Sequence, residues 1–383
     1  MSTKQLFFLL GFMAFMLVQG PAIGQTTSAL PVYTASQNTN NDEKPDVLSL
    51  LVNHTATYTE NTENAANTAM IIDKLLQETN GQAESKIHKK FSRLLKRLHL
   101  TSALEQAQAN HSLYLPLANL FSRIKLYPLA MKCYLKTIPV VPPGTGALNY
   151  QSMADTSDLP VDPLNFTTVD DSLYTAKMDW LEHHPNQKHQ KAVNGDAITK
   201  AFNDGKEAIA YAMLFQVQQP VPGKNKVFKG IDAGHTFITL IKYNRDSGTV
   251  CRSFGFYPQK DNIFSGTPLC PTTASVFKND EGHNWDILLG RFVSRAQFKK
   301  VLKLISKFEA TEYKLSKNNC ADFALQAAAI AGIYIGDTKA KWPLGYGNNP
   351  GKIGQSILQG NVNTANQATN TTPLYTYNTI LSN

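Results

Sequence analysis

A cysteine stands where an apolar helix is predicted to begin, and this position gives a thiol the surroundings of a nucleophile. Cys320 follows two asparagines in the stretch KNNCADFALQAAAIAG. Asn318 or Asn319 can cap the helix, and the apolar residues after Cys320 extend it toward Gly332. In the first turn, unpaired amide hydrogens and the positive end of the helix dipole stabilise a thiolate, which lowers the pKa of the thiol from about 8.5. The same amides can bind a developing oxyanion.

His235 is the histidine that best suits the role of base for such a thiol. It begins a predicted strand, HTFITL, directly after Gly234. Side chains alternate along a strand, so His235 shares a face with Phe237 and Thr239. A histidine at the end of a sheet, against a helix N-terminus that bears a cysteine, is the geometry of a Cys-His dyad.

The order of these two residues resembles that of a known superfamily. A histidine on a strand followed by NNCADFA at a helix start is similar to the circularly permuted papain-like thiol hydrolases. That superfamily contains bacterial cell-wall peptidases and, as a permuted branch, lecithin:retinol acyltransferase. In the usual papain order the nucleophile comes first, whereas here His235 precedes Cys320. The resemblance covers roughly residues 207–360 and implies that Cys320 is the nucleophile and His235 the base.

The resemblance also implies a polar residue on the following strand that orients the imidazole. Counting back through the RDSG turn places Ser253 to Tyr257 beside Leu240 to Thr236, so Ser253 or Tyr257 is the candidate. Each has an ordinary alternative, because Ser253 can face solvent and Tyr257 can pack in the core.

Three further features near these residues allow two interpretations each. Asp322 is interpreted as a first-turn carboxylate that the helix dipole favours, with a substrate contact as the alternative. His283, in the acidic stretch NDEGHNWD, belongs either to a surface loop or to the far wall of the cleft. The turn-rich segment Trp342–Gly354 forms either a loop over the cleft or a plain surface turn.

The elements that position these residues predict an α+β fold. A helical N-terminal region is followed by a permuted papain-like domain with an antiparallel sheet and packed helices. Strand-type patterns occupy Glu207–Pro220, Ala233–Asn244 and Gly248–Pro258, of which the last two form a hairpin through RDSG. A further strand, ILLGRFV, precedes a helix that the capping box SRAQ opens, with Phe298, Val301, Leu302, Ile305 and Phe308 on one face.

The domain organisation follows from shifts in composition. A charged start, an apolar run and small residues before Gln25 indicate a cleaved secretory signal peptide, and stretches rich in Thr, Asn and Gln indicate flexible segments. The predicted parts are a signal peptide at 1–24, a flexible leader at 25–68, a helical region at 69–140, a linker at 141–165, the papain-like catalytic domain at 166–360 and a polar tail at 361–383.

The helical region contains one segment that resembles a tetratricopeptide hairpin. Its two helices join near Leu126, with the small Ala130 where they cross and the large Tyr134 beyond, and Cys133 is expected to be a buried core residue. Earlier in the region, Ile87–Leu98 is amphipathic and basic. It is interpreted as a bundle helix with a solvated basic face rather than a membrane-surface helix.

Composition excludes several classes of protein. The formal charge of +8 favours anionic partners, but export argues against nucleic acid. The four cysteines lack the spacing of a zinc site, and Cys251 and Cys270 can pair in an oxidising compartment. The histidines of HHPNQKH are interpreted as a solvated loop rather than a metal site, so no cofactor is expected.

Together these features predict a secreted or periplasmic cysteine hydrolase. It cleaves an amide bond in a cell-wall or other peptide through a thioester acyl-enzyme. One alternative is a lipid acyl hydrolase or acyltransferase with the same dyad. Another is a non-catalytic protein that binds a protein partner through its helical half. No nucleic-acid partner is expected, and contact with a membrane surface is not favoured.

Overall fold

The computed structural model describes residues 111–138, 191–230, 232–246, 248–260, 264–267, 269–342, 345–364 and 373–377. The predicted signal peptide, leader and linker lie outside the described residues, as do the Ile87–Leu98 helix and the histidines of HHPNQKH.

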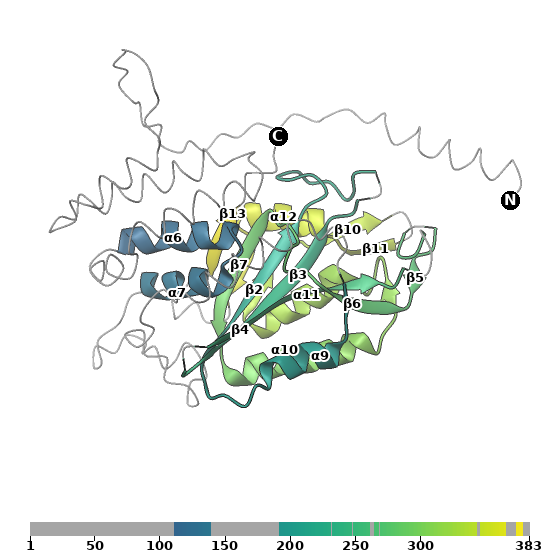
Figure 1. Cartoon of the computed structure of the whole chain (residues 1–383). Helices are drawn as coiled ribbons and strands as arrows, with labels where there is room; N and C mark the ends of the chain where they lie inside the picture. The colour runs from purple at the N-terminus through teal and green to yellow at the C-terminus, as the bar shows by residue number, and fades with distance from the viewer. Residues whose placement is uncertain are drawn as a thin grey trace, which may run out of the picture. The chain divides into compact units, whose positions relative to one another are not determined.

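A seven-stranded antiparallel sheet forms the centre of the described region, and it confirms the α+β class (Figure 1). The strand order is β1-β6-β4-β3-β2-β7-β13, and every neighbouring pair is antiparallel. The strands are β1 (Ala192–Val193), β2 (Ala208–Gln218), β3 (His235–Asn244), β4 (Thr249–Pro258), β6 (Ser275–Asn279), β7 (Ile287–Val293) and β13 (Leu374–Tyr377).

The predicted β3–β4 hairpin is present, but its register differs by one residue from the prediction. Ser253 pairs with Thr239 rather than with Leu240, because residues 244–248 lie between the last pair, Tyr243 and Thr249. Neighbouring residues on a strand face opposite sides, so this register puts Ser253, and with it Tyr257, on the same face as His235.

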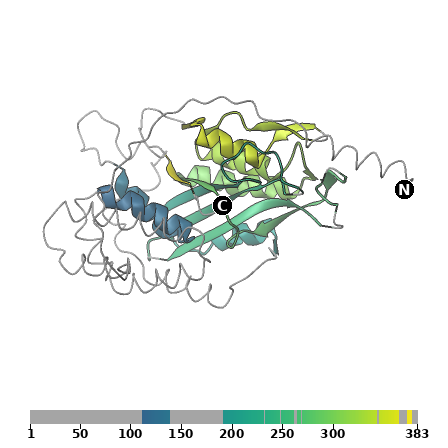
Figure 2. The ribbon, with the colours of Figure 1, turned by 90° about the horizontal axis from the view of Figure 1, so that it is seen from above.

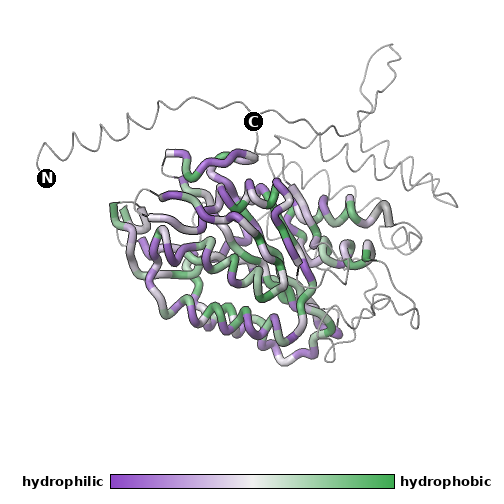
Figure 3. The backbone as a smooth tube through the Cα atoms, turned by 180° about the vertical axis from the view of Figure 1, so that it is seen from behind, coloured by the Kyte–Doolittle hydropathy of each residue, from purple (hydrophilic) through white to green (hydrophobic). Residues whose placement is uncertain are grey.

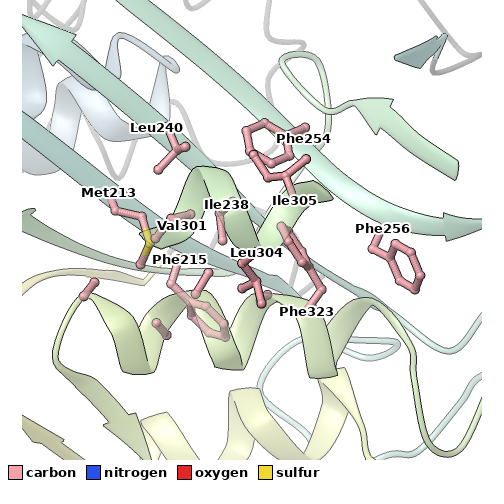
Figure 4. Packing of buried hydrophobic residues seen from close by; sticks show 14 of the residues in the cluster. Met213, Phe215, Ile238, Leu240, Phe254, Phe256, Val301, Leu304, Ile305 and Phe323 are labelled. Carbon is pink, nitrogen blue, oxygen red and sulfur yellow. The ribbon is translucent and has the colours of Figure 1, made fainter. Parts of the chain in front are cut away.

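Four helices cover one face of the sheet, and they share one hydrophobic core with it. They are α9 (Gly195–Phe202), α10 (Arg295–Glu309), α11 (Cys320–Ile330) and α12 (Pro350–Leu358). Figure 4 shows Phe323 of α11 and Ile305 of α10 among the strand residues Phe254, Ile238 and Phe215.

Helix α10 begins with the predicted capping box between Ser294 and Gln297. Its buried face includes Leu304, whereas the predicted Leu302 is only partly buried. Leu304 lies three residues after Val301 and four before Phe308, so its side chain lies on the same buried face of α10.

The predicted helical hairpin is also present, as α6 (His111–Arg123) and α7 (Tyr127–Thr137). Ala130 and Cys133 are buried as expected. The hairpin packs on alternate residues of β2, including Ala212 and Leu214, and therefore shares a core with the sheet face opposite α11. Seen from above, the blue helical pair and the yellow-green helices are separated by the strands (Figure 2).

Short strands complete the described region. Three two-stranded sheets pair β5 (Thr272–Thr273) with β8 (Tyr313–Lys314), β9 (Ile333–Ile335) with β12 (Val362–Thr364), and β10 (Lys339–Trp342) with β11 (Gly345–Asn348). The segment expected to be a polar tail thus supplies β12 and β13, and the buried Leu374 shows why its PLYTY stretch joins the main sheet.

Green, hydrophobic stretches alternate with purple, hydrophilic ones along the strands and helices, as Figure 3 shows. No helix among the described residues is long and apolar enough to cross a membrane.

Candidate active site

The N-terminus of α11 is a closely capped helix end that fixes the place of Cys320. Asn319 is the cap, and its side chain accepts the amide of Asp322 while Asp322 Oδ2 accepts the amide of Asn319. The Asn319 side-chain amide also donates to the carbonyl oxygens of Leu315 and Asn348. Cys320 is therefore the first residue of the helix, where the positive end of the helix dipole favours a negative sulfur. Asp322 acts as the predicted first-turn carboxylate.

The structure brings the Cys320 thiol into hydrogen-bond contact with the imidazole of His235. Both residues are buried, with 6% of each exposed. Burial alone raises the pKa of the thiol, but the hydrogen bond and charge of His235, together with the Thr236 backbone amide, lower it below its ordinary value. Contact with His235 thus makes this thiol easier to ionise than an ordinary cysteine.

His235 is held on its other side by Asp280, a residue that the sequence analysis did not identify. His235 Nε2 lies 3.1 Å from Asp280 Oδ2, and Asp280 is fully buried. Burial lowers the pKa of His235, but the carboxylate of Asp280 and then the Cys320 sulfur outweigh it and raise this pKa to about 9. Because Nε2 faces Asp280, Nδ1 is the nitrogen left for the thiol.

Of the two residues predicted to orient His235, Tyr257 lies beside the imidazole and Ser253 does not contact it. Tyr257 contacts the group that orients His235, since its hydroxyl donates to Asp280 Oδ1 at 2.6 Å. Its ring also lies against the imidazole, with ring centres 4.3 Å apart. Ser253 does not reach His235, because its hydroxyl hydrogen-bonds with the Thr239 hydroxyl at 2.7 Å. The imidazole is therefore contacted directly by the carboxylate of Asp280, which in turn accepts the hydroxyl of Tyr257.

Gly255 leaves the space that the His235–Asp280 pair occupies. It lies on β4 between Ser253 and Tyr257, on the face that carries His235. A Cβ at this position would overlap His235 Nε2 and Asp280 Oδ2. A glycine is required here by the close approach of these two side chains, and not by backbone conformation.

Tyr313 is a second residue that the sequence analysis missed. It lies on β8, seven positions before the cysteine, and is buried. Its hydroxyl hydrogen-bonds with both the backbone amide and the sulfur of Cys320. Burial, and then the negative sulfur, raise the pKa of Tyr313 well above its ordinary value, so the hydroxyl keeps its proton. A neutral hydroxyl thus stands beside the sulfur at the helix end.

His283 lies beside the candidate site rather than in a surface loop. Its ring packs edge to face on the His235 ring with centres 5.0 Å apart, and its Nε2 lies 2.9 Å from Gln218 Oε1. Burial, and then the positive charge of His235, lower the pKa of His283 to about 4, so it is neutral. It forms one wall of the His235 environment.

The α6–α7 hairpin makes hydrogen bonds to the segment that carries His283. Lys125, at the α6–α7 turn, is buried and donates from Nζ to the carbonyl of Gly282 and to Asn284 Oδ1, at 3.0 and 3.2 Å. Trp285 Nε1 donates to the Tyr127 hydroxyl at 3.1 Å. The segment that carries Asp280 and His283 is thus fixed by the helices as well as by the sheet.

The structure also shows the outcome of the predictions about the other cysteines and the segment Trp342–Gly354. All four cysteines are free thiols, including Cys251 and Cys270. Among the described residues, no three His, Cys, Asp or Glu side chains converge as a metal site requires. The segment Trp342–Gly354 contains the end of β10, strand β11 and the start of α12, and Asn348 of β11 donates to Asp322 Oδ1 at 2.7 Å.

Comparison with protein-family models, with curated proteins and with solved structures finds no match to this chain. The resemblance to permuted papain-like hydrolases therefore stays a prediction that rests on the residues themselves. What the geometry offers chemically is a thiol in contact with an imidazole, a buried carboxylate behind the imidazole, and hydrogen-bond donors beside the sulfur.

Proposed function

We propose that this protein is a secreted cysteine hydrolase that cleaves an amide bond in a cell-wall or other peptide. The observation that carries the proposal is the row Cys320, His235, Asp280, in which the thiol contacts an imidazole whose Nε2 lies 3.1 Å from a buried carboxylate. A nucleophile, a base and an orienting group in this order are the parts of a thiol hydrolase.

The first chemical step is attack of the Cys320 sulfur on the carbonyl carbon of the amide. The sulfur forms the new bond, and the carbonyl electrons move onto oxygen. That oxygen lies at the positive end of the α11 dipole and receives a hydrogen bond from the Tyr313 hydroxyl. His235 then gives its Nδ1 proton to the departing nitrogen, so an amine leaves and a thioester remains.

The second step returns the enzyme to its starting state. His235, now neutral, takes a proton from water, and the resulting hydroxide attacks the thioester carbonyl. The sulfur leaves as a thiolate and the carboxylic acid is released. Asp280 stabilises the imidazolium that forms twice in the cycle, and it holds the ring in the tautomer that keeps a proton on Nε2.

The proposals of secretion and of a peptide substrate rest on the sequence rather than on the geometry of the site. The apolar run before Gln25 supports secretion, and the resemblance to cell-wall peptidases supports a peptide substrate. Cys320 is 6% exposed, so the scissile carbonyl has to enter a narrow space. This favours a slender peptide stem over the surface of a folded protein.

The test uses purified mature protein and peptide fragments of a bacterial cell wall. We expect new amino groups and shortened fragments by mass spectrometry, and a thioester-linked mass on the protein after rapid acid quench. Cys320→Ala should abolish both signals, whereas Ser253→Ala, which changes a residue outside the Cys320–His235–Asp280 row, should retain them. Equal product release by wild type and Cys320→Ala would refute a thiol mechanism.

A further inference from the structure

The segments around the N-terminus of α11 form one connected rim. The rim consists of the described residues of 220–233, 259–271, 313–318 and 337–349. Hydrogen bonds join its parts: the Leu315 amide donates to the Pro271 carbonyl, Asn319 Nδ2 to the Asn348 carbonyl, and Asn349 Nδ2 to the Val227 carbonyl, all at 2.9 Å. Because Asn319 caps α11, the rim surrounds the helix end that carries Cys320.

Positive charge dominates the rim. Among its described residues the exposed acids are Asp232 and Asp337, and Asp337 pairs with Lys352 of α12 at 2.6 Å. The exposed lysines are spread over all four segments, and only Lys314 has a carboxylate partner among the described residues, Glu312 at 3.4 Å. These lysines are Lys224, Lys226, Lys229, Lys260, Lys314, Lys317, Lys339 and Lys341.

At the opposite end of the sheet, basic side chains form ion pairs with carboxylates. There Lys206 pairs with Asp246 at 2.8 Å, and Arg245 pairs with Glu207 at the same distance. Lys242 pairs with Asp204. These three positive charges are therefore compensated by neighbouring carboxylates, whereas most lysines of the rim are not.

Exposed apolar side chains lie on the same segments as the lysines. Phe228 is 38% exposed in the segment of Lys226 and Lys229, and Leu269 is 58% exposed. Phe264 and Tyr346 are also exposed. Only three other large hydrophobic side chains among the described residues are as exposed, and none of the three belongs to the rim: Leu115, Tyr334 and Tyr375.

We propose that the rim is a docking surface for an anionic lipid bilayer, with Phe228, Leu269 and Tyr346 entering the headgroup region between the lysines. Lysines alone would equally suit a soluble polyanion, but such a polymer offers no apolar region for exposed phenylalanine and leucine side chains. A bilayer interface provides phosphates for the lysines and acyl chains for the apolar groups. Docking would turn the Cys320 end of the sheet toward the membrane.

The test is co-sedimentation of the full mature protein with vesicles of phosphatidylcholine, alone or mixed with phosphatidylglycerol. We expect binding to the anionic vesicles only, and a loss of binding as salt is raised. Phe228→Ser with Leu269→Ser should weaken binding by about tenfold or more. Replacing Lys224, Lys226 and Lys229 by Gln should do the same.

Matched controls come from the same classes of residue away from the rim. Leu115→Ser with Tyr334→Ser, and Lys299→Gln with Lys300→Gln on α10, should bind as wild type. Cys320→Ala should also bind as wild type, because docking does not depend on the proposed reaction. The lipid proposal is overturned if anionic vesicles leave the protein unbound, or if the Phe228 and Leu269 variant binds undiminished, which would indicate a soluble polyanion as the partner.

Discussion

Asp280 and Cys320 both contact the imidazole of His235. Asp280 Oδ2 lies 3.1 Å from Nε2, and the thiol hydrogen-bonds with the remaining nitrogen. The carboxylate comes from the end of β6 and the thiol from the start of α11, so the sheet and the helix jointly fix the ionisation of the pair.

Replacing Asp280 by Asn should remove the charge that stabilises the imidazolium. We expect kcat to fall by about 10³-fold. The pKa of His235, raised to about 9 in the native protein, should fall, so the alkaline limb of the pH-rate profile should move to lower pH. Ser253→Ala is the control and should leave both quantities near wild type, because Ser253 pairs with Thr239. An unmoved alkaline limb in Asp280→Asn would mean that Asp280 does not act on His235.

Gly255→Ala should disrupt the site by steric overlap. The added Cβ meets both His235 Nε2 and Asp280 Oδ2, so one of the two side chains must move. We expect a loss of at least about 10²-fold in kcat/KM, because a displacement of about 1 Å has this effect on an aligned site. Gly282→Ala, in the adjacent loop, meets nothing within 4 Å and is the matched control. Equal activity of the two variants would contradict the described packing.

Tyr313→Phe removes one hydroxyl from beside the sulfur and leaves the ring in its core. The hydroxyl hydrogen-bonds with the amide and sulfur of Cys320, so its loss should lower kcat by about 10²-fold with little change in KM. Steady-state kinetics on the cell-wall peptides measures the effect. A kcat that rises in this variant would show instead that the hydroxyl blocks the oxyanion position.

Asp286→Asn should stabilise the fold at neutral pH. Asp286 is fully buried, and its Oδ2 accepts the Gln219 amide while Oδ1 has no hydrogen-bond partner among the described residues. Burial raises its pKa from 3.8 to about 6. The folded state therefore binds this proton more tightly than the unfolded state, and Asp286 costs stability as pH rises from about 4 through about 6.

The free energy of unfolding of Asp286→Asn should exceed that of wild type by about 1 kcal/mol at neutral pH. The difference should be absent below about pH 4, where the wild-type carboxyl is protonated in both states. Urea denaturation at the two pH values measures it. A variant less stable than wild type at neutral pH would show that the charged form is well accommodated.

Local patterns explain which parts of the site the sequence could predict. The NNC stretch and Asp322 identify a capped helix start, and the strand pattern after Gly234 identifies the position of His235. Both signals lie within a few residues of the side chain concerned. The capping box at Ser294 was predictable for the same reason.

Asp280 and Tyr313 were missed because long-range pairing places them. Asp280 reaches His235 only because β6 pairs with β4, and the Asp280 amide donates to the Ser253 carbonyl at 2.9 Å. Tyr313 reaches Cys320 through the pairing of β8 with β5. The acidic stretch NDEGHNWD after a strand was the one available signal for Asp280. The register alone does not separate Tyr257 from Ser253, because both side chains lie on the face of β4 that carries His235.

Ionisation of Cys320 tests most directly whether the thiol and His235 form a reactive pair. It can be followed as the difference in ultraviolet thiolate absorbance between wild type and Cys320→Ser, from about pH 4 to about pH 10. This readout needs no substrate and no access of a reagent to a buried sulfur. We predict a step well below the ordinary thiol value of about 8.5, which His235→Ala moves to higher pH. A step at or above about 8.5 in wild type, unchanged in His235→Ala, would contradict the proposed dyad.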